Sequence, residues 1–139
     1  YIACNPLRIM GESSSYSSLN KPLIIPQSLL SDSIKNKFSK VKTLNFGIGL
    51  KQNNFNFMDN GAIIPKFYTL SYALAVVTSG CSKKILLAGF DGYGKDDQRN
   101  KVIDEIFDIY KKTKKSLSIT FLTPSSYNFS KNITNEFQK

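Results

Sequence analysis

The sequence contains no histidine and no tryptophan, and it has only two cysteines. Without histidine, this chain cannot form a Ser–His or Cys–His nucleophile pair, a histidine general base or a histidine-ligated zinc site. The cysteines, Cys4 and Cys81, match no CxxC or other metal-ligand spacing, so no metal site is predicted and no cofactor is implied. Both lie beside apolar runs, and we expect both to be buried free thiols.

Long apolar runs are missing as well. The longest are far too short to cross a bilayer, and the amino terminus lacks the pattern of a secretory signal peptide. We therefore expect a cytoplasmic protein with no membrane span. The first residue is Tyr1, not Met, and it already lies in what reads as a strand. We expect the chain to be a fragment or carboxy-terminal module of a longer protein.

Arginine is scarce although the chain is basic. The formal net charge is +9, yet Arg8 and Arg99 are the only arginines. Arginine is the usual residue for bidentate contacts to phosphates and bases, and most lysines are scattered, so no nucleic-acid partner is predicted. A lysine-rich run at 111–115 closes a predicted helix. It is either a solvated helix end that complements the helix dipole or a binding patch.

The length predicts one domain over residues 1–139, and the 41% of apolar residues can build its core. Apolar periodicity predicts alternating strands and helices. Strands are predicted at 1–4, 23–25, 41–50, 84–88 and 116–122, with an edge strand near 55–57; helices at 27–38, 66–79 and from Asp96 or Asp97 to 112; loops at 11–20 and 61–65; and a polar tail at 128–139. We expect an α/β fold with a Rossmann-like, doubly wound, mostly parallel sheet in three layers.

Ligands of such sheets bind at the carboxyl ends of the strands, and one loop there carries the strongest signal. It is Gly89-Phe-Asp-Gly-Tyr-Gly94, whose three glycines permit a tight turn with positive φ. Asp91 is either a carboxylate that faces a ligand or an Asx turn that caps the next helix. No catalytic set is identified, and Asp91 is the one candidate for a catalytic acid or base.

Two other strand ends carry polar side chains. Asn5 and Arg8 either recognise a base or phosphate, or form an Asn-Pro turn with a surface arginine. Thr123 and Ser125 either hold a sugar or phosphate through their hydroxyls or serve only the loop. The predicted ligand-binding residues are thus Asn5, Arg8, Gly89, Asp91, Gly92, Tyr93, Thr123 and Ser125.

Several of these motifs together resemble a known fold. The run from Ile63-Ile-Pro65 through Lys84-Ile-Leu-Leu-Ala-Gly-Phe-Asp-Gly-Tyr93, the opening Ala3-Cys-Asn5 and the closing Leu122-Thr-Pro-Ser125 resemble the core of the bacterial sialyltransferase-like α/β fold. The chain is also similar to the Rossmann-like carboxy-terminal domain of bacterial aldolase-like (HMGL-like) proteins, and to pterin diphosphokinase-like domains. The resemblance covers residues 1–10 and 61–127, and it implies that Asn5 contacts a nucleotide.

The resemblance implies a module that binds a nucleotide, nucleotide-sugar or phosphosugar. Its setting would be an aldolase of bacterial sugar or surface-polysaccharide metabolism, with a barrel domain upstream in the same polypeptide. The sialyltransferases use a histidine base and a long lid after their motif. This chain has no histidine, and Tyr93 and Asp96 are almost adjacent, so that activity is not expected. Two alternatives stay open: a divergent glycosyl- or diphosphoryl-transferase with Asp91 as base or metal ligand, and a non-catalytic structural or oligomerisation module.

Overall fold

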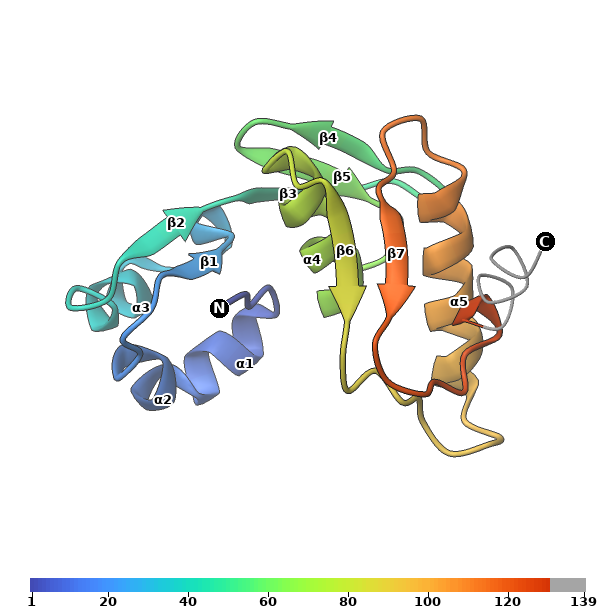
Figure 1. The fold of residues 1–139 in the computed structure, drawn as a ribbon. Helices are drawn as coiled ribbons and strands as arrows, with labels where there is room; N and C mark the ends of the chain where they lie inside the picture. Colours follow the sequence, from blue (N-terminus) through green and yellow to red (C-terminus); the bar gives the residue numbers. More distant parts are fainter. Residues whose placement is uncertain (131–139) are drawn as a thin grey trace.

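The computed structural model describes residues 1–130, and the statements below concern that part of the chain (Figure 1). Helices are interspersed with strands of only three or four residues, so the fold is α/β with small sheets. The elements are α1 (Pro6–Gly11), α2 (Ser13–Ser17), β1 (Leu23–Ile25), the 3₁₀ helix η1 (Gln27–Leu29), α3 (Asp32–Lys37), β2 (Thr43–Asn45), β3 (Gly47–Leu50), β4 (Asn56–Met58), β5 (Gly61–Ile64), α4 (Thr69–Ser79), β6 (Lys84–Leu87), α5 (Gln98–Lys111) and β7 (Ser118–Phe121).

The strands form three small sheets, and most of the pairings are parallel. β1 pairs with β2 and β6 with β7, both in parallel. In the third sheet β5 lies between β3, to which it is parallel, and β4, to which it is antiparallel. The strand predicted at 1–4 is reduced to a single parallel bridge between Ile2 and Ile24 of β1.

Two hydrophobic clusters lie on opposite faces of β1. Leu23 and Ile25 belong to a smaller cluster that also contains residues of α1 and α3, whereas Ile24 packs against the larger cluster. This alternation follows from the period of two along a strand. The larger cluster includes the fully buried Tyr72 of α4 and Phe107 of α5. Both helices therefore provide much of the core.

Two segments predicted as loops are regular structure. Residues 11–20 complete α1 and form α2, because Tyr16 and Leu19 pack against the smaller cluster and offset the poor helix propensity of the serines. Residues 61–64 form the central strand β5. A Cβ on Gly61 would lie 2.9 Å from the Gly47 carbonyl oxygen, so this glycine permits close approach of two backbones instead of marking a loop.

Several predicted boundaries are wrong. The helix predicted at 27–38 is broken at Leu30, which is extended and buried, into η1 and α3. The strand predicted at 41–50 divides into β2 and β3, which pair in different sheets. The helix predicted from residue 66 begins at Thr69. Packing of Leu30 in the smaller cluster and pairing of β2 and β3 in different sheets set the first two boundaries, and local propensity encodes neither.

Burial also differs from expectation at two places. Cys4 is buried as predicted, but Cys81 is exposed, in a positive-φ turn after α4. The apolar strand predicted at 84–88 is covered on one face only, because Ile85 is buried whereas Leu86 is 48% exposed. Among the helices of residues 1–130, none has both the length and the apolar character that crossing a membrane requires.

The segment predicted as a polar tail begins inside the core. Phe129 is buried and stacks on Phe107, with ring centroids 4.7 Å apart. The Asp104 carboxylate accepts hydrogen bonds from the backbone amides of Asn128 and Phe129. The buried aromatic ring outweighs the polar composition around it. Residues 131–139 of the predicted tail lie outside the described part of the chain.

The parallel pair β6–β7 brings two loops to one edge of the molecule. Both strands run in the same direction in Figure 1, so the loops at 88–97 and 122–127 leave from the same side. The first loop ends at α5, and Asp97 is the N-cap of this helix. The sequence had predicted that either Asp96 or Asp97 would begin it. The Asp97 carboxylate accepts a hydrogen bond from the Arg99 amide at 2.8 Å. Six of the eight predicted ligand-binding residues lie in these two loops, and the other two, Asn5 and Arg8, lie near α1.

Candidate site at the carboxyl ends of β6 and β7

The two loops at this edge are tied together by hydrogen bonds. The Thr123 hydroxyl accepts from the Gly89 amide at 2.9 Å. Both the amide and the hydroxyl of Ser126 donate to the backbone carbonyl of Asp91, at 2.8 and 2.9 Å. Gly92, with φ of +107°, lies so close to Ser126 that no side chain fits between them. The glycine-rich motif is therefore a fixed turn.

A cavity of about 480 Å³ lies against this turn. It is bounded by the glycine-rich motif on one side and by the start of α4, with Tyr68 and Thr69, on the other. The remaining lining side chains are mostly apolar or aromatic, and Asp91 is the one charged residue among them. A partly apolar cavity with few polar groups is the usual form of a small-molecule site.

The Asp91 carboxylate has no hydrogen-bonding or ionic partner within residues 1–130. Its backbone carbonyl holds the turn, and Asp97, not Asp91, caps α5. The interpretation of Asp91 as the helix cap is thus wrong. An exposed carboxylate that lines a cavity and is not used by the fold is available to accept hydrogen bonds from ligand hydroxyls.

Asn5 and Arg8 lie next to a second, smaller cavity of about 150 Å³, which shares Thr69 with the first. The Asn5 side-chain oxygen caps α1 by accepting from the amides of Leu7 and Arg8. Arg8 pairs with Glu12 at 3.2 Å. Asn5 therefore has a structural role, and its side-chain NH₂ group has no hydrogen-bonding partner within residues 1–130. The structure brings these two residues beside the first cavity without placing them in it.

Cys4 also lines the smaller cavity, 3.8 Å from the Thr69 hydroxyl. Burial raises the pKa of the Cys4 thiol above its ordinary value, an effect only partly opposed by this contact with Thr69. The thiol therefore stays protonated near neutral pH, which does not suit a nucleophile.

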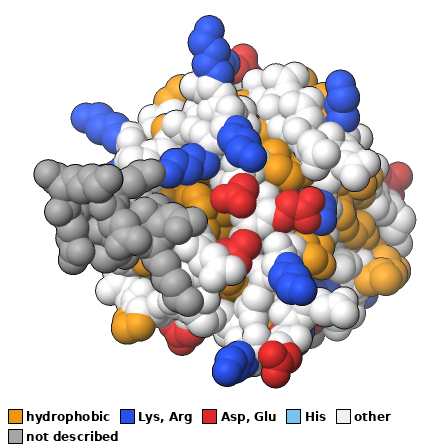
Figure 2. Space-filling model, turned by 90° about the vertical axis from the view of Figure 1, so that its right-hand side faces the viewer, with side chains coloured by type: hydrophobic (Ala, Val, Ile, Leu, Met, Phe, Trp, Pro, Cys, Tyr) orange, Lys and Arg blue, Asp and Glu red, His pale blue; other side chains and the backbone are white. Residues whose placement is uncertain are grey.

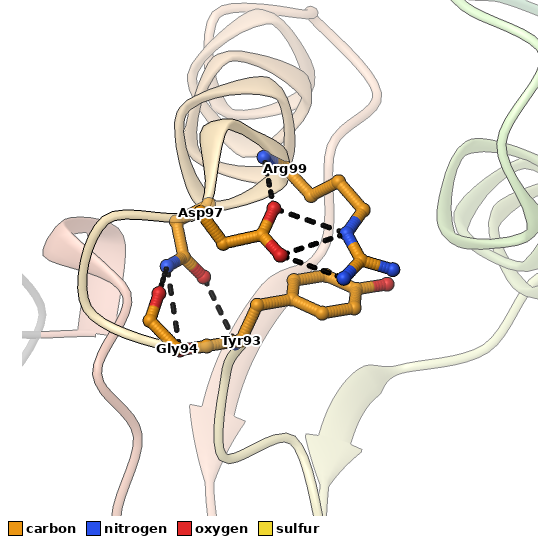
Figure 3. Close-up of polar contacts among 5 residues, drawn as sticks. Tyr93, Gly94, Asp97 and Arg99 are labelled. Carbon is orange, nitrogen blue, oxygen red and sulfur yellow. Dashed lines mark hydrogen bonds and ion pairs between the residues drawn. The ribbon is translucent and has the colours of Figure 1, made fainter.

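Tyr93 lines the larger cavity and carries a partner that the sequence did not indicate. The Arg99 guanidinium lies 4.0 Å from the centre of the Tyr93 ring and forms a fork with the Asp97 carboxylate, at 2.6 to 3.1 Å (Figure 3). The Asn100 side chain accepts from the Tyr93 amide and donates to the Gly94 carbonyl. The first turn of α5 thus holds Tyr93 in place. The i, i+2 spacing of Asp97 and Arg99 did not indicate this pair, because residues two positions apart in a helix do not usually face each other.

Thr123 and Ser125 serve the loop. The Thr123 hydroxyl is used by Gly89, and the Ser125 hydroxyl accepts from the Tyr127 amide at 3.4 Å. Ser126, which was not among the predicted ligand-binding residues, makes the contact that shapes the glycine-rich turn. Sequence alone does not show which hydroxyls of such a loop hold the loop and which face a ligand, because each can bond to either the nearby backbone or a ligand.

Charges of both signs are mixed on the neighbouring surface. On the part of this face drawn in colour, Asp and Glu side chains lie among the Lys and Arg side chains (Figure 2). Lys66 and Glu105 form an ion pair at 2.6 Å. Within residues 1–130, no group of three acidic or cysteine side chains is arranged to hold a metal ion.

Comparison of the chain with protein-family models, with curated proteins and with solved structures finds no match. The site is therefore interpreted from its own geometry.

Proposed function

We propose that this chain is a module that binds a nucleotide or phosphosugar in the cavity at the carboxyl end of β6. The observation that supports it most directly is the unpartnered Asp91 carboxylate, set in a 480 Å³ cavity beside Tyr68 and Tyr93. Sugar and ribose hydroxyls are donors that a carboxylate accepts well, and tyrosine rings pack against sugar or base faces while their hydroxyls bond at the rim.

The start of α4 favours an anionic group on the same ligand. α4 has 11 residues, and its N-cap Tyr68 provides no side-chain hydrogen bond to the first amides. Such amides and the helix dipole favour phosphate. Thr69, at the first position of this helix, lines the cavity and adds a hydroxyl. A ligand whose hydroxyls bind Asp91 and whose phosphate faces Thr69 would satisfy both the carboxylate and the first amides of α4.

We also infer that the small sheets belong to one Rossmann-like, three-layer arrangement. The parallel pairings β1–β2, β3–β5 and β6–β7 support it, as does the placement of two core clusters on opposite faces of β1. Binding at the carboxyl ends of strands is the general rule for such sheets. The role of such a module in an aldolase-like protein of sugar metabolism rests on the sequence resemblance alone.

Isothermal titration with CMP, UMP, AMP and glucose 1-phosphate tests the proposed function. We expect at least one of them to bind, and Asp91→Asn to weaken that binding by about tenfold, the typical effect of losing a charged hydrogen-bond acceptor. Asp59→Asn, which removes an exposed carboxylate in the turn between β4 and β5, is the matched control. Failure of all four to bind contradicts the proposal. Turnover of a sugar nucleotide that Asp91→Asn abolishes would instead indicate a transferase.

An interaction module is a second candidate, favoured by the open face of β6–β7. Leu86 is 48% and Leu122 is 60% exposed, although parallel sheets are normally covered on both faces. If this face mediates self-association, sedimentation of the wild-type chain will depend on concentration. Leu86→Glu should then abolish that dependence. A monomer at all concentrations argues against self-association.

A further inference from the structure

The Arg99 side chain lies beside the larger cavity, and its charge is paired with Asp97. Its guanidinium lies over the ring of Tyr93, one of the residues that line this cavity. The side chain is 57% exposed. Figure 3 shows the free end of the guanidinium beside the Tyr93 hydroxyl, both directed away from Asp97. The nitrogens Nε and Nη2 bind Asp97, whereas Nη1 has no partner within residues 1–130.

The cavity needs a cation if it is to accept a phosphate. Asp91 is its one charged lining residue, and an unpaired carboxylate repels a second anion at short range. The nearby guanidinium has the planar fork that matches phosphate oxygens. Its bond to Asp97 is a forked ion pair between side chains that are 57% and 26% exposed, so solvent screens it in part. A phosphate offers the guanidinium the same forked geometry, so the exchange replaces one anionic partner with another of the same kind.

We propose that Arg99 supplies the positive charge that binds the phosphate in this site, in addition to the first amides of α4, and that Asp97 is its internal competitor. The guanidinium turns from Asp97 to the phosphate of a nucleotide or phosphosugar whose hydroxyls are held by Asp91. Tyr93 guides this movement, because its ring supports the guanidinium plane in the free state. The inference rests on the proposed function and adds the residue that distinguishes phosphorylated from unphosphorylated ligands.

Two substitutions separate the roles of the pair. Arg99→Gln removes the charge but keeps a polar side chain of similar length at an exposed position. Asp97→Asn removes the competing charge and preserves helix capping, since asparagine is as good an N-cap as aspartate. Lys35→Gln is the matched control, because it also removes the cation of an exposed ion pair, formed with Asp32 at 2.9 Å.

The test is titration of each variant with CMP, UMP, AMP and glucose 1-phosphate, and with cytidine, uridine, adenosine and glucose as unphosphorylated counterparts. For the phosphorylated compound that binds, we expect Arg99→Gln to weaken binding at least tenfold. Asp97→Asn should tighten it about two- to fivefold, the range that corresponds to an exposed ion pair. Neither variant should change the affinity for the unphosphorylated counterpart by more than Lys35→Gln does.

The outcomes distinguish this inference from the proposed function. If a phosphorylated compound binds but Arg99→Gln leaves its affinity unchanged, the assignment of Arg99 is wrong and the binding module stands. Weaker binding in Asp97→Asn likewise overturns the competitor role. If no compound of either series binds to the wild-type chain, the proposed function and the role of Arg99 fail together.

Discussion

The three glycines of the 89–94 motif predict a graded series of stability losses on substitution by alanine. Gly94 has open space around it and no positive φ, so Gly94→Ala should change the free energy of unfolding by less than about 0.5 kcal/mol. Gly89 also has open space, but its φ is +67°. Gly89→Ala should therefore cost about 1 kcal/mol, the strain of a left-handed backbone with a Cβ.

Gly92 combines both kinds of constraint. Its φ is +107°, and a Cβ would overlap the Ser126 hydroxyl oxygen. Gly92→Ala thus adds backbone strain of about 1–3 kcal/mol to the loss of the Ser126 hydrogen bond to the Asp91 carbonyl, worth about 0.5–1.5 kcal/mol. We expect a total of about 2–4 kcal/mol, the largest loss of the three.

Urea unfolding followed by far-ultraviolet circular dichroism measures the series, because the chain has no tryptophan to serve as a fluorescent probe. The double variant Gly92→Ala with Ser126→Ala isolates the contact, since removal of the hydroxyl relieves the closest approach. Its loss should be smaller than the sum of the two single losses. Equal losses for Gly94→Ala and Gly92→Ala, or strict additivity in the double variant, would refute this account of the turn.

Three further predictions concern other parts of the described chain. Phe129→Ala should cost about 3–5 kcal/mol in urea unfolding, because a fully packed ring is removed from the core; a loss below about 1 kcal/mol would mean that this ring does not pack. The Arg99 side chain lowers the pKa of Asp97 below its ordinary value, so the cap stabilises the fold above that value. The stabilisation by the ionised Asp97 carboxylate should disappear as the pH falls through the lowered pKa, below pH 4. In a plot of unfolding free energy against pH, Asp97→Asn should therefore show a smaller loss of stability at acid pH than the wild-type chain. With a thiol reagent, Cys81 should react in the folded protein and Cys4 only on unfolding; equal rates would contradict their different burial.

The sequence predicted those parts of the fold in which local pattern and tertiary structure agree. The helix that became α5 was predicted with its cap and apolar stripe because one face of it packs on the core. β5 was missed because Gly61 and Pro65 are loop signals, whereas here the glycine admits a neighbouring backbone. α2 was missed because its serine-rich sequence has low helix propensity and only tertiary packing holds it.

The sequence suggested where to look for a candidate site, but it did not show which side chains hold the loops and which are available to a ligand. The motif at 89–94 lies beside the cavity at the end of β6, and three polar groups that were candidates for ligand contact, on Asn5, Thr123 and Ser125, bond to the backbone. Arg99 was not predicted as a site residue, because its approach to Tyr93 depends on how the first turn of α5 meets the loop. Sequence spacing does not specify that angle.

The structural role of Asp91 and the ligand-binding role proposed for it fall to different atoms of the same residue. The turn uses only its backbone carbonyl, which any amino acid would supply to Ser126. The carboxylate contributes nothing to the caps, ion pairs or hydrogen bonds of residues 1–130, and it lines the cavity instead. Its removal should therefore leave the unfolding free energy nearly unchanged while it alters ligand affinity. The same separation does not hold for Asp97, whose carboxylate caps α5 and binds Arg99 at once. A loss of binding in an Asp91 variant thus reports on the site itself, whereas Asp97 must be tested with a substitution that preserves the cap.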